Sequence, residues 1–305
     1  MDELFNFTSS DYIFAAHIGL SIVGTVGNTL VVLTIIGVKF LHTYTNFLIA
    51  HQAVADALVC VSNLIFHFRY VPVTLINSAT CILFYHRISF YIFALASSFS
   101  LLCLNVERYI AIVHPLHYPN YVTNARVAQA LVAIWTISLL LALVVGLTSV
   151  YYDAELNQCA TAESDVFMQV VQVATGGFAL IVNLVGIVVP YTQILASINS
   201  SAQRQRANGM AVDGLLQARR QVINVLMFVA AAYCITWIPV NIIYALLSFN
   251  VIVDPLFYDL SEVVILCNSV VNPFIYAFKY KEFRRGFHRL FSCTGRQGRV
   301  HPIRY

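Results

Sequence analysis

Residues 266–283 read LCNSVVNPFIYAFKYKEF, an apolar segment that contains an amide and a proline at Asn272 and Pro273. Proline removes one backbone hydrogen bond and bends a helix. Inside a bilayer the freed carbonyl needs another partner, so such a kink survives where neighbouring helices or water supply one. The basic amphipathic run from Lys279 to Leu290 follows, and runs of this kind lie along membrane surfaces. The segment therefore predicts a kinked membrane helix that is built to move, with a surface helix after it.

The composition is that of a membrane protein. Hydrophobic residues make up 59% of the 305 residues and charged residues 10%, and the mean hydropathy is +0.77, which is far more apolar than a soluble domain. Roughly 20 apolar residues cross a bilayer core, and seven segments qualify, of which the last is short. They are residues 12–38, 40–68, 88–106, 127–152, 166–203, 221–253 and 263–278. We therefore expect an all-α membrane protein, a seven-transmembrane helix bundle with a short amphipathic cytoplasmic eighth helix.

The charges predict the orientation of the chain. With the amino terminus outside the cell, 15 of the 17 lysines and arginines fall on the cytoplasmic side, with Arg69 and Arg87 as the exceptions, in agreement with the positive-inside rule. The net charge of +3 is then a consequence of topology and does not indicate nucleic-acid binding. The expected division is an extracellular tail at 1–11, the bundle at 12–279, the amphipathic helix at 280–292 and a cytoplasmic tail at 293–305.

The cysteines and one sequon fit this topology. Cys81 and Cys159 both lie in the oxidising compartment, so we predict a disulfide between them, although the sequence alone does not fix the pairing. Cys293 follows the basic run, where it is either placed for palmitoylation or an idle exposed thiol. Asn6 begins the sequon Asn-Phe-Thr on the extracellular side and is the predicted glycosylation site.

Seven short motifs are distributed along the chain, and their joint order and spacing are far more specific than any one of them. They are Gly27-Asn28, Ala53-Val-Ala-Asp56, Glu107-Arg108-Tyr109, Trp135, Tyr191, Trp237-Ile-Pro239 and Asn272-Pro273-x-x-Tyr276. Together they resemble the rhodopsin-like (class A) G-protein-coupled receptors. Within that class, residues 97–126 and 268–285 look most like adenosine receptors and their melanocortin-like relatives. The resemblance implies a plasma-membrane receptor that performs no covalent chemistry, activates a heterotrimeric G protein and has arrestin and receptor kinases as further partners.

Asp56 is a carboxylate in the middle of the second segment, and such groups nearly always face the bundle interior and have a partner. The resemblance implies a sodium ion here, held by oxygen atoms as a hard cation requires. The matching residues are Asp56, Ser97, Asn268, Ser269 and Asn272. The alternative is a protonated Asp56 that hydrogen bonds to Asn28 and Asn272 without a metal. We favour sodium because the polar set is complete.

Arg108 closes the third segment. An arginine at a membrane interface can simply snorkel, but its position between Glu107 and Tyr109 favours a switch. By resemblance, Glu107 holds Arg108 in the resting state, and on activation Arg108 turns toward Tyr191 and Tyr276 and contacts the G protein. The full predicted switch and coupling set is Glu107, Arg108, Tyr109, Tyr191, Trp237, Pro239, Asn272, Pro273 and Tyr276.

Two features depart from the family pattern. Cys81 stands two residues further from Arg108 than the family norm, so its disulfide requires an altered outer end of the third helix. Arg219-Arg220 stand where many relatives have an acid that pairs with the switch arginine. Because like charges cannot form that pair, high basal activity is a hypothesis.

The ligand class is narrowed by exclusion. A retinal pigment needs a lysine in the last helix, whereas every lysine here is cytoplasmic, so we expect no retinal and no other organic cofactor. Phe90 stands where amine receptors have an aspartate. Tyr244 and Leu266 stand where adenosine receptors have an asparagine and a histidine. The adenosine likeness therefore fails where the nucleoside would bind.

What remains is an aromatic cavity with few polar groups. Its predicted lining is Phe66, His67, Tyr70, Phe90, Tyr91, Ala94, Thr175, Trp237, Asn241, Tyr244, Tyr258 and Glu262. Glu262 shares a helical face with Asn272, at steps of three or four residues, so it points inward. Glu262 either binds a cationic group of the ligand by charge pairing and cation–π contact, or it pairs with Arg69, Arg87 or His67. The two readings carry equal weight.

The interpretation is a G-protein-coupled receptor for an extracellular small molecule or short peptide. Alternatives are a receptor for a cationic amine or peptide terminus bound through Glu262, a receptor for a neutral nucleoside-like or lipid ligand, and a largely ligand-independent, constitutively active receptor. A transporter or channel is a remote alternative, because repeated halves and discontinuous helix pairs are not found in the sequence. An enzyme is not expected, because the segments lack a His-Glu-x-x-His motif or paired catalytic aspartates.

Overall fold

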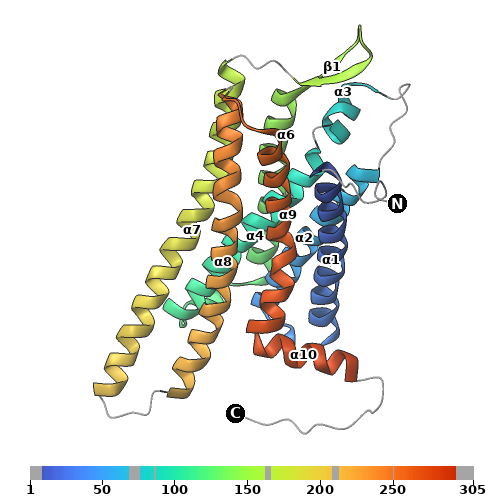
Figure 1. Cartoon of the computed structure of the whole chain (residues 1–305). Coiled ribbons are helices and arrows are strands. Elements are labelled where there is room, and N and C mark those ends of the chain that lie inside the picture. Colours follow the sequence, from blue (N-terminus) through green and yellow to red (C-terminus); the bar gives the residue numbers. More distant parts are fainter. Residues whose placement is uncertain are drawn as a thin grey trace.

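Seven long helices lie side by side and form the body of the protein (Figure 1). The structure is a computed structural model that describes residues 9–68, 76–85, 87–161, 166–207, 213–249 and 251–292. Within these residues, seven helices are long and apolar enough to cross a membrane, which confirms the expected bundle. They are α1 (Ser9–Gly37), α2 (Tyr44–Phe68), α4 (Ile88–Val113), α6 (Asn124–Ser149), α7 (Val166–Ala207), α8 (Asp213–Ser248) and α9 (Pro255–Lys279).

Short elements mark the two ends of this bundle. The hairpin end carries α3 (Ser78–Thr80), the single π-helical turn η4 (Cys81–Tyr85), and the antiparallel hairpin of β1 (Val150–Asp153) and β2 (Gln158–Thr161). The α10 end carries the 3₁₀ turn η2 (Lys39–Leu41), α5 (Tyr118–Tyr121) and α10 (Lys281–Ser292), which runs across the bundle (Figure 1). We use these two names for the ends below.

The helices α2, α4 and α9 form the middle of the bundle. More than half of the apolar stretch of each is buried within the protein, against a third or less for α1, α6, α7 and α8. The outer helices therefore expose many large apolar side chains, among them Ile36, Phe178 and Ile235. Such a surface is unfavourable in water and suits the hydrocarbon of a bilayer.

Most helix boundaries differ by a few residues from the sequence interpretation, and three of the differences change how the chain is divided. The last span is not short, because α9 begins at Pro255: the side chain of Asp254 accepts a hydrogen bond from the backbone N–H of Leu256 at 2.9 Å, and the proline takes the first helical turn, where its missing N–H costs nothing. The fourth span ends at Ser149, and residues 150–152 belong to β1. The second begins only at Tyr44, after the turn η2.

The kink at Pro273 in α9 finds its partner on α1. Pro273 lacks the N–H that would bond to the carbonyl of Ser269, four residues earlier. The side-chain amide of Asn28 donates to this carbonyl instead, at 2.9 Å. Gly27 allows the close approach, because a Cβ there would lie 3.2 Å from the proline ring. The neighbour that the sequence required for a stable kink is therefore the Gly27-Asn28 motif.

The predicted amphipathic helix is present as α10, directly after the extended residue Tyr280. Its buried Phe283 packs against Tyr276 of α9, with ring centroids 6.4 Å apart. Gly286 faces η2, where a Cβ would come within 2.5 Å of the Leu41 side chain. The opposite face exposes basic side chains such as Arg284. Its position on the cytoplasmic side stays a prediction.

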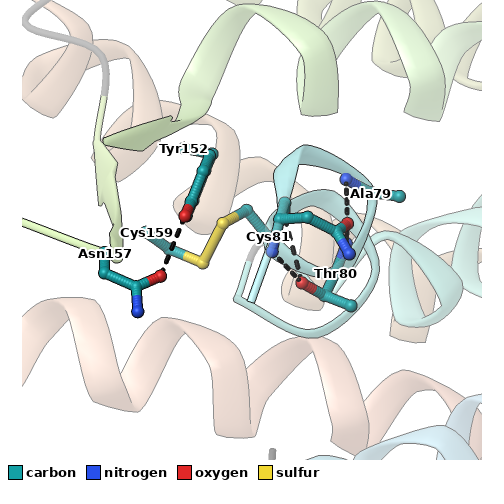
Figure 2. Close-up of a disulfide and its surroundings, with 7 residues drawn as sticks. Ala79, Thr80, Cys81, Tyr152, Asn157 and Cys159 are labelled. Carbon is teal, nitrogen blue, oxygen red and sulfur yellow. Dashed lines mark hydrogen bonds between the residues drawn. A yellow bond between two sulfur atoms is a disulfide. The ribbon is translucent and has the colours of Figure 1, made fainter. Parts of the chain in front are cut away.

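A disulfide joins Cys81 of η4 to Cys159 of β2, which confirms the predicted pairing (Figure 2). Asn77 caps the short helix before it by accepting two backbone N–H groups. The predicted alteration of the outer third helix is also found, because η4 and a left-handed Arg87 with φ of 57° precede α4. A bulky residue in that region of backbone space is uncommon. The break between η4 and α4 absorbs the additional length.

Candidate ligand cavity and coupling site

A cavity of about 500 Å³ lies between α4, α6, α7, α8 and α9, near the hairpin end. This volume is within the range of ligand sites in proteins. Seven of the predicted ligand residues line the cavity. They are Tyr91, Thr175, Trp237, Asn241, Tyr244, Tyr258 and Glu262.

Four predicted ligand residues do not line this cavity, although two of them, Phe66 and Phe90, lie close to the Arg87 guanidinium beside it. Phe66 and His67 pack edge to face against each other, with centroids 5.3 Å apart, and His67 also packs against Phe14 of α1. Phe90 and Ala94 are buried in an apolar cluster between the helices. Tyr70 lies outside the described residues. The pocket is therefore shifted away from α2.

The wall formed by α6 and α7 was missed. It consists of Leu141, Ala142 and Val145 from α6 and of Val173, Gly176, Gly177, Ala179 and Leu180 from α7. In a membrane helix an apolar side chain that faces a cavity and one that faces lipid have the same composition, so the sequence held no signal that distinguishes them. Arg87, at the entry to α4, also lines the cavity.

The polar end of the cavity is an ion pair between Arg87 and Glu262. Nη1 of Arg87 contacts Oε2 of Glu262, Nη2 donates to Oδ1 of Asn63, and both charged side chains are 8% exposed. The guanidinium also lies 4.2 Å from the ring centroid of Phe66 and 4.7 Å from that of Phe90. Burial lowers the pKa of the Arg87 guanidinium, yet an arginine stays protonated in proteins. Of the two readings for Glu262, the structure contains the pairing with Arg87.

Three phenols use the other oxygen of Glu262. Oε1 accepts hydrogen bonds from Tyr258 at 3.3 Å and from Tyr91 and Tyr244 at 3.5 Å. Tyr91 and Tyr244 also hydrogen bond to each other at 3.0 Å. Arg87 contacts one carboxylate oxygen and the tyrosines bond to the other, so a cationic ligand of Glu262 would compete with groups that are already in place.

The floor of the cavity is aromatic. Trp237 stacks on the buried Tyr233, with centroids 5.8 Å apart and planes at 27°. Asn241, one turn above, donates to the Trp237 carbonyl at 2.9 Å. Pro239 lies inside the same helix and removes one backbone hydrogen bond, so α8 can bend here. A ligand that pushes against Trp237 therefore acts at the point where α8 can bend.

The predicted sodium residues gather around Asp56, which is completely buried. Ser97 donates to its Oδ1 at 2.6 Å and Asn272 to its Oδ2 at 2.8 Å, and Ser269 is a third hydrogen-bond partner. Asn268 is turned toward α8, where its Oδ1 accepts from Thr236. Asn272 thus matches the alternative without a metal, whereas the Asn28 amide donates to the backbone of α1 and α9. No basic side chain in the described part of the chain pairs with Asp56.

At the α10 end, Glu107 holds Arg108 with two short hydrogen bonds, 2.6 Å from Nε and 2.7 Å from Nη2. Glu107 is itself fixed by Thr45 of α2, at 3.1 Å, and by Tyr118 of α5, at 2.6 Å. Burial and the hydrogen bond to Glu107 raise the pKa of the Tyr118 phenol. The side chain of Glu107 is 4% exposed and that of Arg108 is 18% exposed. The carboxylate is thus anchored and the arginine lies at the edge.

The other predicted switch residues are placed around this pair. Tyr276 is buried and donates to Gln52 of α2 at 3.4 Å. Tyr191 packs on an apolar cluster of α7, and Tyr109 bonds to His114 at 3.1 Å. Among the described residues neither Tyr191 nor Tyr276 hydrogen bonds to Arg108, and the proposed switch stays a prediction.

Several predictions fall outside the described part of the chain. These are the glycosylation site Asn6, the lipidation site Cys293 and the side chains of Arg219 and Arg220. Each of them stays a prediction.

Comparison with known proteins identifies the family. The family model for the 7 transmembrane receptor (rhodopsin family) matches residues 27–276, so the chain belongs to this family. It is 30% identical to the human galanin receptor type 2, over 92% of this chain and 72% of that receptor. It is 28% identical to the allatostatin-A receptor of Bombyx mori, over 92% and 79%, and 28% identical to human trace amine-associated receptor 9, over 89% and 82%.

The chain is therefore a multi-pass G-protein-coupled receptor and not an enzyme. The relatives named above are galanin, allatostatin-A and trace amine receptors, and they do not support a closer likeness to adenosine and melanocortin receptors. It rests on residues 97–126 and 268–285 alone and stays a prediction.

Proposed function

We propose that this receptor lies in the plasma membrane with its hairpin end outside, binds a short peptide in the cavity, and activates a heterotrimeric G protein at its α10 end. The observation that carries the proposal is that one helix, α4, lines the cavity with Tyr91 and also carries the closed Glu107–Arg108 pair. Tyr91 in the cavity wall and Arg108 are 17 residues apart, which is about 26 Å along a helix. A ligand at one end and a protein at the other are thus connected through one central helix.

The charge distribution supports this orientation. Of the 17 lysines and arginines, 15 lie on the side of α10 when the amino terminus is outside, as the positive-inside rule requires. The disulfide between Cys81 and Cys159 lies at the hairpin end, and disulfides form in the extracellular compartment.

A peptide is favoured over a small amine for two reasons. Receptors for galanin and allatostatin-A are among the relatives, although a trace amine receptor is too. The acid that would bind a protonated amine, Glu262, is already paired with Arg87. The cavity of about 500 Å³ would take part of the peptide, and the rest would lie against the hairpin end.

In this proposal, activation runs from the floor of the cavity to the arginine. Ligand contact displaces Trp237, α8 bends at Pro239, and the α10 end of the helix moves away from α4. Arg108 then leaves Glu107 and turns toward Tyr191 and Tyr276. Arrestin and receptor kinases would meet the same opened surface.

A sodium ion fits the site around Asp56. The site offers a buried carboxylate without a basic partner among the described residues, and the hydroxyl groups of Ser97 and Ser269 lie beside it. The unbonded Oδ1 of Asn28 is also buried in this region. Asp56 and Ser97 would hold the ion, with Ser269, Asn268 and Asn272 around it. A bound cation would supply charge neutralisation that favours the closed arrangement.

The test is guanine-nucleotide exchange on purified receptor with a panel of G proteins, screened against short peptides and protonated amines. We expect a peptide to stimulate exchange, Arg108→Ala to abolish it, and Arg126→Ala to leave it unchanged, because Arg126 is an exposed arginine near the same end that lies over the Tyr121 ring. Millimolar sodium should lower basal exchange in the wild type and not in Asp56→Asn. Stimulation by amines alone, or by no compound with any G protein, would contradict the proposal.

A further inference from the structure

The ion pair between Arg87 and Glu262 is surrounded by groups that bind a guanidinium. A carboxylate and an amide oxygen approach the guanidinium from α9 and α2, and the rings of Phe66 and Phe90 lie close to it. A planar cation that donates hydrogen bonds from a rigid fork of N–H groups and stacks on aromatic rings suits such a site better than a compact ammonium does. The chemistry of the site therefore specifies a guanidinium.

The walls of this site are held by bonds that do not involve Arg87. Glu262 keeps its three tyrosine hydroxyls. The Asn63 amide donates to the Ser21 hydroxyl at 2.9 Å and lies 3.4 Å from Nδ1 of His17, both on α1. Removal of the Arg87 side chain should consequently leave a vacancy with its carboxylate, its amide oxygen and its two rings in place.

Arg87 reaches this site from an unusual position. It stands in the left-handed conformation between η4 and α4, outside the regular turns of either element. The left-handed conformation costs a residue with a side chain roughly 1 kcal/mol of free energy. Arg87 is thus attached through a break in the helix, and its side chain can leave the site without distorting α4.

We propose that Glu262, Asn63, Phe66 and Phe90 form a guanidinium-binding site that Arg87 occupies as a tethered ligand, and that an arginine side chain of a peptide binds there by replacing it. The second half of this proposal rests on the proposed function, because it requires a peptide ligand. The first half does not depend on signalling. An untethered guanidinium competes poorly in the wild type, because the attached one is present at a high effective concentration.

The experiment is thermal unfolding of the purified full-length receptor with millimolar ethylguanidinium. In Arg87→Ala the midpoint should rise by several degrees, in a saturable manner, as expected for a ligand that binds only the folded state. The wild type and Arg126→Ala should not shift, and neither should Arg87→Ala combined with Glu262→Gln. Tetramethylammonium at the same ionic strength is the chemical control. An equal shift in the wild type, in the double variant or with tetramethylammonium would overturn the site, as would no shift in Arg87→Ala.

Arg87→Ala on its own is at risk of not surviving purification. It is then prepared with ethylguanidinium present throughout, and its aggregation is followed after dialysis. Retention of the folded receptor by ethylguanidinium and not by tetramethylammonium supports the site, and loss under both conditions overturns it.

The arginine side chain itself is tested with Nα-acetyl-arginine amide and its neutral citrulline counterpart on Arg87→Ala. Stabilisation by the first and not by the second supports the proposal, and equal behaviour contradicts it. These measurements need no G protein, so they distinguish failure of the site from failure of the proposed signalling function.

Discussion

The receptor has an acid–arginine pair at each end, and the two are built differently. At the hairpin end Arg87 and Glu262 are 175 residues apart and join the start of α4 to α9, with both side chains 8% exposed. At the α10 end Glu107 and Arg108 are neighbours on α4, and Arg108 is 18% exposed. The first pair joins two helices, whereas the second joins none.

This difference separates a fixed end from a movable end. If α4 and α9 part, the Arg87–Glu262 pair breaks and leaves two charges buried, which is strongly unfavourable. Arg108 can swing away by rotating its own side chain, and Glu107 keeps its hydrogen bonds to Thr45 and Tyr118. The structure therefore resists movement at the hairpin end and allows it at the α10 end, where the G protein is proposed to bind.

The largest effect is expected for Glu262→Gln, which leaves Arg87 charged, buried and without its acid. Loss of one partner of a buried pair destabilises a protein by about 3 to 5 kcal/mol, so folded receptor at the cell surface and the thermal midpoint should both fall sharply. Both quantities are measured on the full chain, by surface labelling and by thermal unfolding in detergent.

Two controls sharpen this prediction. Asp259→Asn removes a carboxylate from the same helix, outside the ion pair, and should change little. Arg87→Met together with Glu262→Gln removes both charges and should restore much of the stability, because the uncompensated charge is gone. If the double variant is as unstable as Glu262→Gln, the two residues do not act as a pair and the comparison of the two ends fails.

At the α10 end, Glu107→Gln should raise activity instead of destroying the fold. The amide cannot hold the guanidinium as a carboxylate does, and charge-assisted hydrogen bonds contribute about 1.5 to 3 kcal/mol, so the population of the released state should rise by roughly ten- to a hundredfold. Basal guanine-nucleotide exchange at equal surface expression measures this. Glu282→Gln is the control, because that exposed acid is at the same end of the bundle and contacts Tyr280 only at 3.3 Å. A fall in basal exchange would mean that Glu107 supports the active state.

The sequence predicted the parts of the molecule that depend on local chemistry. Apolar length gave the seven helices, and the proline in α9 required a donor that proved to be Asn28. Arg87 was one of three partners that the sequence offered for Glu262. Its pairing with Glu262 depends on the left-handed backbone before α4, and that conformation depends on how the whole hairpin end folds. The hairpin was missed because residues 150–152 continue an apolar run without a break. The α6–α7 wall was missed because lipid-facing and cavity-facing residues are alike.

The contact between α1 and α9 at the Pro273 kink supplies a third prediction. Asn28→Ala removes the donor to the Ser269 carbonyl, which then has neither a proline N–H nor a side-chain partner. A buried carbonyl left unsatisfied costs about 1 to 3 kcal/mol, so thermal stability should fall by less than in Glu262→Gln. Thr25→Ala on the same helix is the matched control, because its hydroxyl bonds only to its own helix at Ser21. Equal losses in the two variants would show that the kink finds its partner elsewhere, for example in water.

The smallest effect is expected for Tyr118→Phe. The phenol of α5 donates to Glu107 at 2.6 Å, and its removal leaves the Glu107–Arg108 contacts and the Thr45 contact in place. A single hydrogen bond to a charged group contributes about 1.5 to 3 kcal/mol when buried, but water can take the place of this half-exposed phenol, so basal exchange should rise only a few-fold, less than in Glu107→Gln. Tyr121→Phe is the control, because that ring in the same short helix is exposed. If Tyr118→Phe raises basal exchange as much as Glu107→Gln or more, the contact between α5 and α4 holds the α10 end closed, and the acid–arginine pair does not. Both ends of the bundle would then be held by contacts between different elements.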